Sequence, residues 1–174
     1  PLATQTNSKG PHQYIEGIHP THIKDGIGCF LIDTDGKMYI DTISGLGAII
    51  LGYRVESSLG VFSLPHYKEV ELAEMLVERI PGCEMVRFAK NGQDVCAAAV
   101  RLARAYTKGK KIISVGYHGH WDQFVVNTPK NGGVLPELRE FLVEVNFDDI
   151  DQISDYIEHS DEPFACVIIE VPPI

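Results

Sequence analysis

Positive charge is scarce in this sequence. Lysine and arginine total 15 against 24 aspartates and glutamates, and the formal net charge is −9. Nucleic-acid binding needs clustered basic residues that neutralise phosphates, and only Lys108, Lys110 and Lys111 form such a cluster. A solvated helix end explains these three lysines. We therefore expect no general affinity for nucleic acid.

Paired cysteines and long apolar runs are missing as well. The four cysteines are far apart and form no Cys-x-x-Cys pair, which argues against a zinc or disulfide framework and favours an intracellular, cytoplasmic protein with reduced thiols. No apolar run reaches the length of a membrane span, and no signal peptide opens the sequence. The chain begins at Pro1 and a final apolar run breaks off at Pro172-Pro173-Ile174, so we expect both ends to be cut.

Apolar residues, in contrast, are plentiful enough for a core. The chain has 174 residues, of which 44% are hydrophobic and 22% charged, as is typical of one globular unit or a large part of one. Residues 1 to about 25 are polar and show no periodicity, so we interpret them as an irregular lead-in. We expect residues 1–60 to hold this arm, a hairpin and a glycine-rich loop, and residues 61–174 to begin a larger α/β domain.

The pattern of apolar residues predicts strands that alternate with helices. The turn Asp33–Gly36 is expected to join two hairpin strands, because an Asp-Gly pair tolerates the positive φ that such turns require. The remaining predicted elements are a helix over 69–80, a strand over 84–89, a helix over 95–106, a strand over 111–115, a helix after Asp148 or Asp149 and a strand over 164–170. The hairpin strands are expected over 27–32 and 37–41, with a packed glycine-rich loop over 42–53 and a loop-rich segment over 124–140. This order predicts an α/β fold with a mostly parallel sheet.

The predicted helices have recognisable apolar faces. On the 95–106 helix, the apolar stripe consists of Val95, Ala99, Leu102 and Tyr106. On the later helix, Ile150, Ile153 and Ile157 are expected to point inward. The 164–170 run is continuously apolar up to Glu170, as expected of a strand that is covered on both faces.

Two consecutive strand ends carry a candidate binding site. The turn Asn91-Gly92-Gln93 opens the 95–106 helix, and free backbone N–H groups at a helix start hold phosphate well. Tyr117 and His118 follow the next strand, where α/β folds place their ligands. Taken singly, the turn also fits an ordinary helix cap, and the pair also fits a structural aromatic with a hydrogen-bonded loop histidine. Together they predict two loops that face each other across a phosphate-bearing aromatic cofactor.

A metal site is the alternative interpretation of the second loop. His118, His120 and Asp122 stand on alternate residues, and alternate side chains of an extended segment share a face. Metallo-hydrolases of the β-lactamase type use the pattern His-x-His-x-Asp-His, whereas this chain has Gln123 in place of the last histidine. The predicted parallel α/β sheet also differs from their β-sandwich. Metal-dependent hydrolysis is thus a weaker hypothesis than a cofactor site.

A series of short motifs in a fixed order resembles a known family. The motifs are Asp33-Thr34-Asp35-Gly36, Tyr39-Ile40-Asp41, Leu51-Gly52, Glu69-x-Glu71-Leu72-Ala73, Met85-Val86-Arg87-Phe88, Asn91-Gly92, Arg101-Leu102-Ala103-Arg104-Ala105-Tyr106-Thr107, Tyr117-His118-Gly119 and Val167-Ile168-Ile169-Glu170. In this order, over about residues 20 to 171, they resemble the first half of a class III aminotransferase, near the glutamate-1-semialdehyde aminomutase branch. Each motif is short, but the ordered series is specific.

The resemblance implies fold type I of the pyridoxal-phosphate enzymes, with this chain as an incomplete domain. Residues 1–60 would be part of the small domain, and 61–174 the first part of the large cofactor-binding domain. Pyridoxal 5'-phosphate would be held by Asn91, Gly92 and Gln93 at its phosphate, with Tyr117 stacked on its ring and His118 beside it. Ser44, Gly45 and Glu170 would lie on the substrate side. Such an enzyme would be a homodimer that transfers amino groups through a Schiff base.

Two departures from the family pattern affect these expectations. Family members usually carry Thr or Ser after the phosphate-loop glycine, whereas this chain has Gln93, which has no hydroxyl group. The family's Schiff-base lysine and the Asp that pairs with the pyridine nitrogen belong to its second half, and no lysine of this chain matches that position. We therefore expect this chain alone to be inactive. A catalytically inactive binding or scaffolding module of the same fold is the second hypothesis, and the amine or amino acid substrate stays open.

Overall fold

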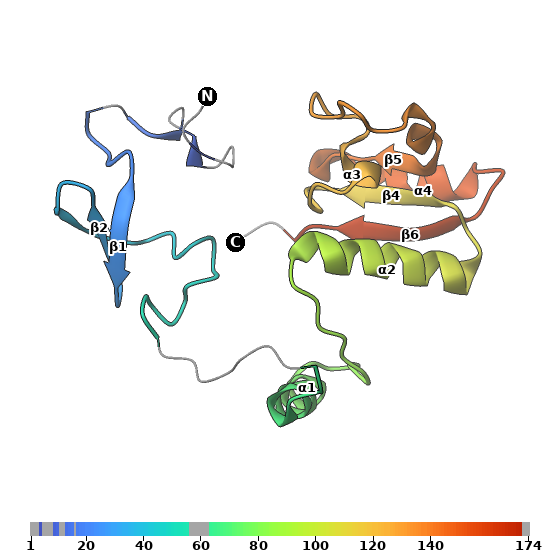
Figure 1. The fold of residues 1–174 in the computed structure, drawn as a ribbon. Helices are drawn as coiled ribbons and strands as arrows, with labels where there is room; N and C mark the ends of the chain where they lie inside the picture. Colours follow the sequence, from blue (N-terminus) through green and yellow to red (C-terminus); the bar gives the residue numbers. More distant parts are fainter. Residues whose placement is uncertain (1–3, 5–8, 11–12, 16, 56–62, 172–174) are drawn as a thin grey trace. The chain divides into compact units, whose positions relative to one another are not determined.

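The computed structural model describes residues 4, 9–10, 13–15, 17–55 and 63–171. The chain divides into two compact units, residues 1–66 and 67–174, which we describe separately (Figure 1). Much of the expected lead-in, the expected boundary near residue 60 and the stretch Pro172–Ile174 lie outside the described residues. In the described part of the chain, no helix has the length and apolarity needed to cross a membrane.

The first unit contains a three-stranded antiparallel sheet in the order β1-β2-β3. Its strands are β1 (Ile23–Ile27), β2 (Phe30–Asp33) and β3 (Met38–Ile40). The predicted Asp33–Gly36 turn is confirmed, and Asp33 Oδ1 accepts the N–H groups of Asp35 (2.9 Å) and Lys37 (2.8 Å). Burial raises the pKa of Asp33, but the N–H of Lys37, the Tyr39 hydroxyl and the N–H of Asp35 together hold it below its ordinary value.

One hairpin strand was predicted too long. The expected strand over 27–32 is interrupted at Gly28, whose φ of +53° turns the chain between β1 and β2. Gly28 instead pairs with Tyr53, at the far end of the glycine-rich loop. An apolar run with a single glycine fits both a straight strand and a tight hairpin, and the positive φ at that glycine decides between them.

The glycine-rich loop is fastened to the sheet by one aspartate. Asp41 Oδ1 accepts the N–H groups of Ile43 (2.9 Å) and Ser44 (3.0 Å), and its Oδ2 accepts the Tyr53 hydroxyl at 2.6 Å. The Tyr53 hydrogen bond is the largest cause that lowers the pKa of Asp41, and the same bond raises the pKa of Tyr53. The loop itself is not packed as expected within this unit, since Leu46 is 81% exposed.

The second unit is built on a parallel sheet in the order β5-β4-β6, which confirms the predicted α/β fold. Its strands are β4 (Lys111–Val115), β5 (Leu142–Glu144) and β6 (Phe164–Ile169). The central strand β4 is the most buried, with Ile112, Ile113 and Val115 fully covered. A fully buried middle strand is what parallel sheets with helices on both faces require.

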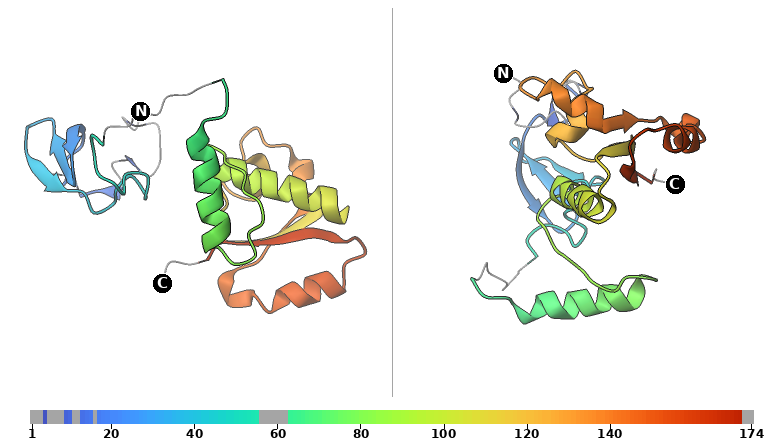
Figure 2. Two further views of the ribbon diagram at one scale, coloured as in Figure 1. Left: turned by 90° about the horizontal axis from the view of Figure 1, so that it is seen from below. Right: turned by 90° about the vertical axis from the view of Figure 1, so that its right-hand side faces the viewer.

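Helices cover both faces of this sheet, and Figure 2 shows α2 and α4 on opposite sides of it. The elements outside the sheet are α1 (Tyr67–Arg79), α2 (Gly92–Thr107), α3 (Asp122–Val125), the short 3-10 helices η3 (Pro136–Phe141) and η4 (Phe147–Asp149), and α4 (Gln152–Glu158). One face packs Val100 of α2 with Phe124 of α3 over Ile112. The other face packs Ile153 over Ile113 and Val115.

Four sequence predictions about this unit are wrong. Residues 84–89 form no strand, because no described segment offers them a ladder, and Met85 is 87% exposed. The face of α2 that packs is Cys96, Val100 and Ala103, whereas the predicted stripe is exposed, to 70% at Leu102 and 87% at Tyr106. On α4 and its approach, only Ile153 of the three isoleucines packs inward. The strand β6 is open on one face of the described unit, where Val167 and Ile169 are exposed.

Candidate functional site

The first part of the site is the start of α2. The helix begins at Gly92, three residues earlier than predicted, so the expected turn is the first turn of the helix itself. Asp94 Oδ2 accepts the backbone N–H of Asn91 at 3.0 Å, which closes the cap from inside the helix. The N–H groups of Gly92 and Gln93 have no acceptor among the described residues. A Cβ added at Gly92 would meet nothing within 4 Å, and unpaired N–H groups at a helix start are the donors that bind anions.

The second part is the loop that leaves the buried strand β4 at Gly116. The carboxylate of Glu170, just past the end of β6, accepts the N–H of Tyr117 at 2.8 Å. A Cβ at Gly116 would lie 2.6 Å from the Cβ of Glu170, so only glycine lets the loop pass this close. The backbone of Tyr117 is thereby fixed while its side chain stays 69% exposed.

The structure brings these two parts together. Gly119 has a φ of +100°, and a Cβ there would lie 2.5 Å from the Cβ and 3.0 Å from the Cα of Gln93. Beside this contact, the N–H of His120 donates to Gln93 Oε1 at 3.3 Å. The loop after β4 therefore crosses the first turn of α2 in van der Waals contact.

His118 occupies a different environment from Tyr117. Its side chain is only 7% exposed, lies against Phe124 with ring centroids 5.3 Å apart, and donates from Nε2 to the carbonyl oxygen of Val115 at 3.0 Å. The ring therefore points into the protein and anchors the loop. In the described part of the chain no three His, Cys, Asp or Glu side chains gather as metal ligands, so the set His118, His120 and Asp122 forms no metal centre there.

The substrate-side candidates lie in both units. Glu170 stands beside Tyr117, as described above, with one carboxylate oxygen engaged by the loop. Ser44 and Gly45 belong to the first unit, where both have positive φ in a tight turn that Asp41 caps. The structure thus joins Glu170 to Tyr117, whereas Ser44 and Gly45 belong to the other unit.

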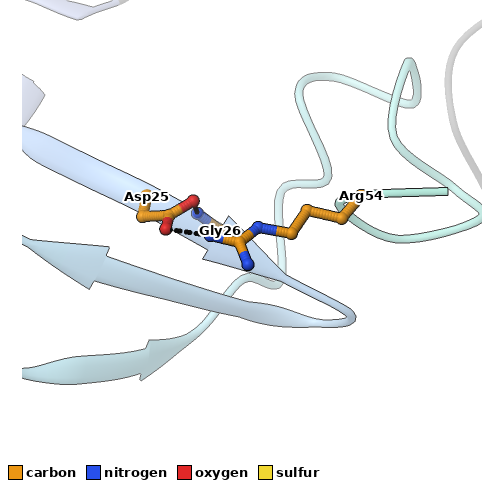
Figure 3. Close-up of polar contacts among 3 residues, drawn as sticks. All are labelled: Asp25, Gly26 and Arg54. Carbon is orange, nitrogen blue, oxygen red and sulfur yellow. Dashed lines mark hydrogen bonds and ion pairs between the residues drawn. The ribbon is translucent and has the colours of Figure 1, made fainter. Parts of the chain in front are cut away.

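Arg54 is the first arginine of the chain and would be the earliest candidate to hold a substrate carboxylate. Its guanidinium forms an ion pair with Oδ2 of Asp25, whose Oδ1 accepts the N–H of Gly26 at 2.8 Å (Figure 3). An arginine that is already neutralised by a neighbouring carboxylate is a poor anion receptor. The first unit by itself therefore offers no prepared carboxylate site at this position.

Two glycines that fix the loop were not among the predicted site residues. Gly116 and Gly119 each make a close approach that a Cβ would prevent. Their spacing on either side of Tyr117-His118 was the available signal. Gln123 was also missed: it is 2% exposed, accepts from Arg104 Nη2 at 2.9 Å and donates to the Leu138 carbonyl at 3.1 Å.

Comparison with known proteins decides the family. Residues 14–171 match the family described as Aminotransferase class-III. The chain belongs to this family. It is 34% identical over 170 residues to a 3-aminobutyryl-CoA aminotransferase of Cloacimonas acidaminovorans, covering 91% of this chain and 40% of that protein. It is 33% identical over 171 residues to a glutamate-1-semialdehyde 2,1-aminomutase of Halobacterium salinarum, covering 87% of this chain and 38% of that protein.

The solved structures agree with this class III aminotransferase assignment. The FumI protein of Sphingopyxis sp. MTA144, solved in a form with pyridoxal phosphate, superposes with a TM-score of 0.79 at 28% identity. The match covers 94% of this chain and 41% of that one. The chain thus spans about two fifths of the length of the relatives it matches. Among these relatives are both aminotransferases and aminomutases.

Proposed function

We propose that the protein is a pyridoxal-phosphate-dependent aminotransferase or aminomutase, and that this chain supplies contacts to the phosphate and the ring of the cofactor. The observation that carries the proposal is the contact between Gly119 and Gln93, which places the free amides of α2 next to the loop that bears Tyr117. The family and the PLP-containing relative support the same cofactor. Residues 1–60 are proposed to be part of the small domain and 61–174 the beginning of the large domain.

The phosphate would be held mainly by backbone groups. The N–H groups of Gly92 and Gln93 lie at the positive end of a 16-residue helix and have no acceptor among the described residues, and Asn91 caps the same turn. A phosphate dianion at such a terminus would gain both hydrogen bonds and the helix dipole.

The ring would be held by Tyr117. Its phenol is exposed and can offer a face to a heteroaromatic ring in an offset stack. The hydrogen bond from its backbone N–H to Glu170 would hold the ring in place. His118 would contribute indirectly, because its hydrogen bond to the Val115 carbonyl anchors the loop that bears Tyr117. Glu170 has a second carboxylate oxygen that could face a substrate amine, with Ser44 and Gly45 as further substrate-side residues.

Pyridoxal phosphate acts as an electron sink that makes amino-group exchange possible. This chain's residues would bind and orient it. The Schiff-base lysine, and the aspartate for the pyridine nitrogen, are proposed to lie in the part of the relatives' length that this chain does not cover. On this proposal the chain alone does not transfer amino groups, and the working protein is a homodimer acting on an amine or amino acid.

The proposal is tested by titrating the protein in its natural full length with pyridoxal phosphate and following the visible absorbance of the bound cofactor. Tyr117→Phe should bind as the parent does, whereas Tyr117→Leu should bind about two- to tenfold more weakly, since an aromatic pair contributes about 0.5–1.5 kcal/mol. The matched control is Tyr156→Leu on α4, which is 41% exposed in the parent and should change nothing. No uptake by the parent, or equal affinities for both leucine variants, would refute the proposal. Uptake without amino-group exchange would indicate an inactive binding module.

A further inference from the structure

Gln93 extends from the first turn of α2 to the neighbouring loop. Its Oε1 accepts the N–H of His120 at 3.3 Å, and its Cβ and Cα are the closest atoms to a Cβ built on Gly119. Because the partner is an N–H group, the carboxamide must turn its oxygen toward the loop. A serine or threonine has a hydroxyl group on Cβ and no carboxamide. The contact with His120 is therefore made by an atom that these residues lack.

The loop is held at two points by side chains from two different elements. Glu170, beyond β6, accepts the N–H of Tyr117 at 2.8 Å, and Gln93, on α2, accepts the N–H of His120. Between these points, His118 is buried and bonded to Val115, while the Tyr117 side chain is 69% exposed. The exposed ring thus sits on a short backbone segment that is fixed on both sides.

We propose that Gln93 is a positioning residue for the Tyr117 loop, and that its carboxamide serves this loop rather than the cofactor phosphate. The inference is tested by two experiments, a structural one without cofactor and one with cofactor. Only the experiment with cofactor rests on the proposed function. The phosphate is then held by the backbone N–H groups at the start of α2, which are the same whatever the side chain at position 93. The side chain determines instead how firmly the ring platform is held against the helix.

The structural arm needs no cofactor. Hydrogen exchange, followed by mass spectrometry on the natural full-length protein without cofactor, should show faster exchange of the peptide that covers residues 117–122 in Gln93→Met. The expected increase is about two- to tenfold, as for the loss of one hydrogen bond to an exposed loop. Gln93→Glu keeps an acceptor oxygen at the same distance and should exchange as the parent does. The matched control is Gln152→Met, on the exposed start of α4, which should leave this peptide unchanged.

Equal exchange of this peptide in Gln93→Met and the parent would overturn the inference. So would faster exchange in Gln93→Glu to the same extent as in Gln93→Met. A Gln93→Met protein that fails to fold would show fast exchange throughout. In that case Gln93→Leu, which also lacks an acceptor oxygen, replaces it and is held to the same expectation.

The cofactor arm compares pyridoxal phosphate with pyridoxal, which lacks the phosphate group. If Gln93 positions the ring platform, Gln93→Met should weaken the binding of both compounds by the same factor, within about twofold. If the Gln93 side chain were instead a ligand of the phosphate, Gln93→Met would weaken the binding of pyridoxal phosphate and leave that of pyridoxal unchanged. That result would overturn the inference. If the parent protein binds neither compound, the proposed function fails, and the exchange experiment still decides whether Gln93 holds the loop.

Discussion

The close passage of the loop over α2 can be tested with a single methyl group at Gly119. Gly119→Ala adds a Cβ at a φ of +100°, 2.5 Å from the Cβ and 3.0 Å from the Cα of Gln93. A non-glycine residue in the left-handed region costs about 1–2 kcal/mol. Forcing an extra carbon into a filled contact costs about 1–3 kcal/mol more, because the Cα of Gln93 belongs to a helix and cannot move alone. We expect a loss of about 2–5 kcal/mol in the free energy of unfolding.

Gly133→Ala is the matched control for this experiment. Gly133 has a φ of +86°, but a Cβ there would meet nothing within 4 Å. This variant should lose only the backbone part, about 1–2 kcal/mol. Urea denaturation of both variants, followed by far-ultraviolet circular dichroism, measures the difference. If the two alanine variants lose equal stability, the loop does not cross the start of α2 as described, and the reasoning about the site fails with it.

Three further predictions concern other parts of the chain. Gln123→Ala should lose about 2–4 kcal/mol in urea denaturation, because it removes two hydrogen bonds and leaves a buried gap; a loss below 1 kcal/mol would contradict its described role. Tyr53→Phe should raise the pKa of Asp41 toward its ordinary value and leave that of Asp33 unchanged. Tyr39→Phe should raise the pKa of Asp33 and leave that of Asp41 unchanged. Carboxyl chemical shifts in an NMR titration measure both values. Because both carboxyl pKa values are lowered in the folded state, the stability that they contribute is present above the unfolded value of about 3.8 and is lost as the pH falls through the lower folded values. Acid unfolding of the first unit at a higher pH in Tyr53→Phe than in the parent would agree with this sign.

Local chemistry made several elements predictable from the sequence. The Asp33–Gly36 turn follows from residues that bond to their own backbone and tolerate positive φ, and the structure contains it. The strand over 111–115 was predicted to the residue, because a short apolar run bounded by lysines and a glycine has few alternatives. The order of short motifs also identified the family, which the family match over residues 14–171 confirms.

Long-range pairing explains the wrong predictions. Residues 84–89 are largely apolar, but a strand exists only where another segment offers hydrogen bonds, and no described segment does. On α2, alanines and other apolar residues surround most of the helix, so the periodicity fits more than one face. The sheet packs against Cys96, Val100 and Ala103 rather than the predicted stripe, and only the position of the strands could select that face.

The candidate site was predictable from the sequence only in part. Each half was predictable, because a helix start with free amides and an aromatic after a buried strand are local features. The connection was not, because it depends on Gly119 meeting Gln93 across 26 residues of sequence. On the proposed function, backbone recognition of phosphate would leave the side chain at position 93 available for another task. In this chain Gln93 accepts the N–H of His120, and we propose that this departure from the family pattern helps to position the loop that bears Tyr117.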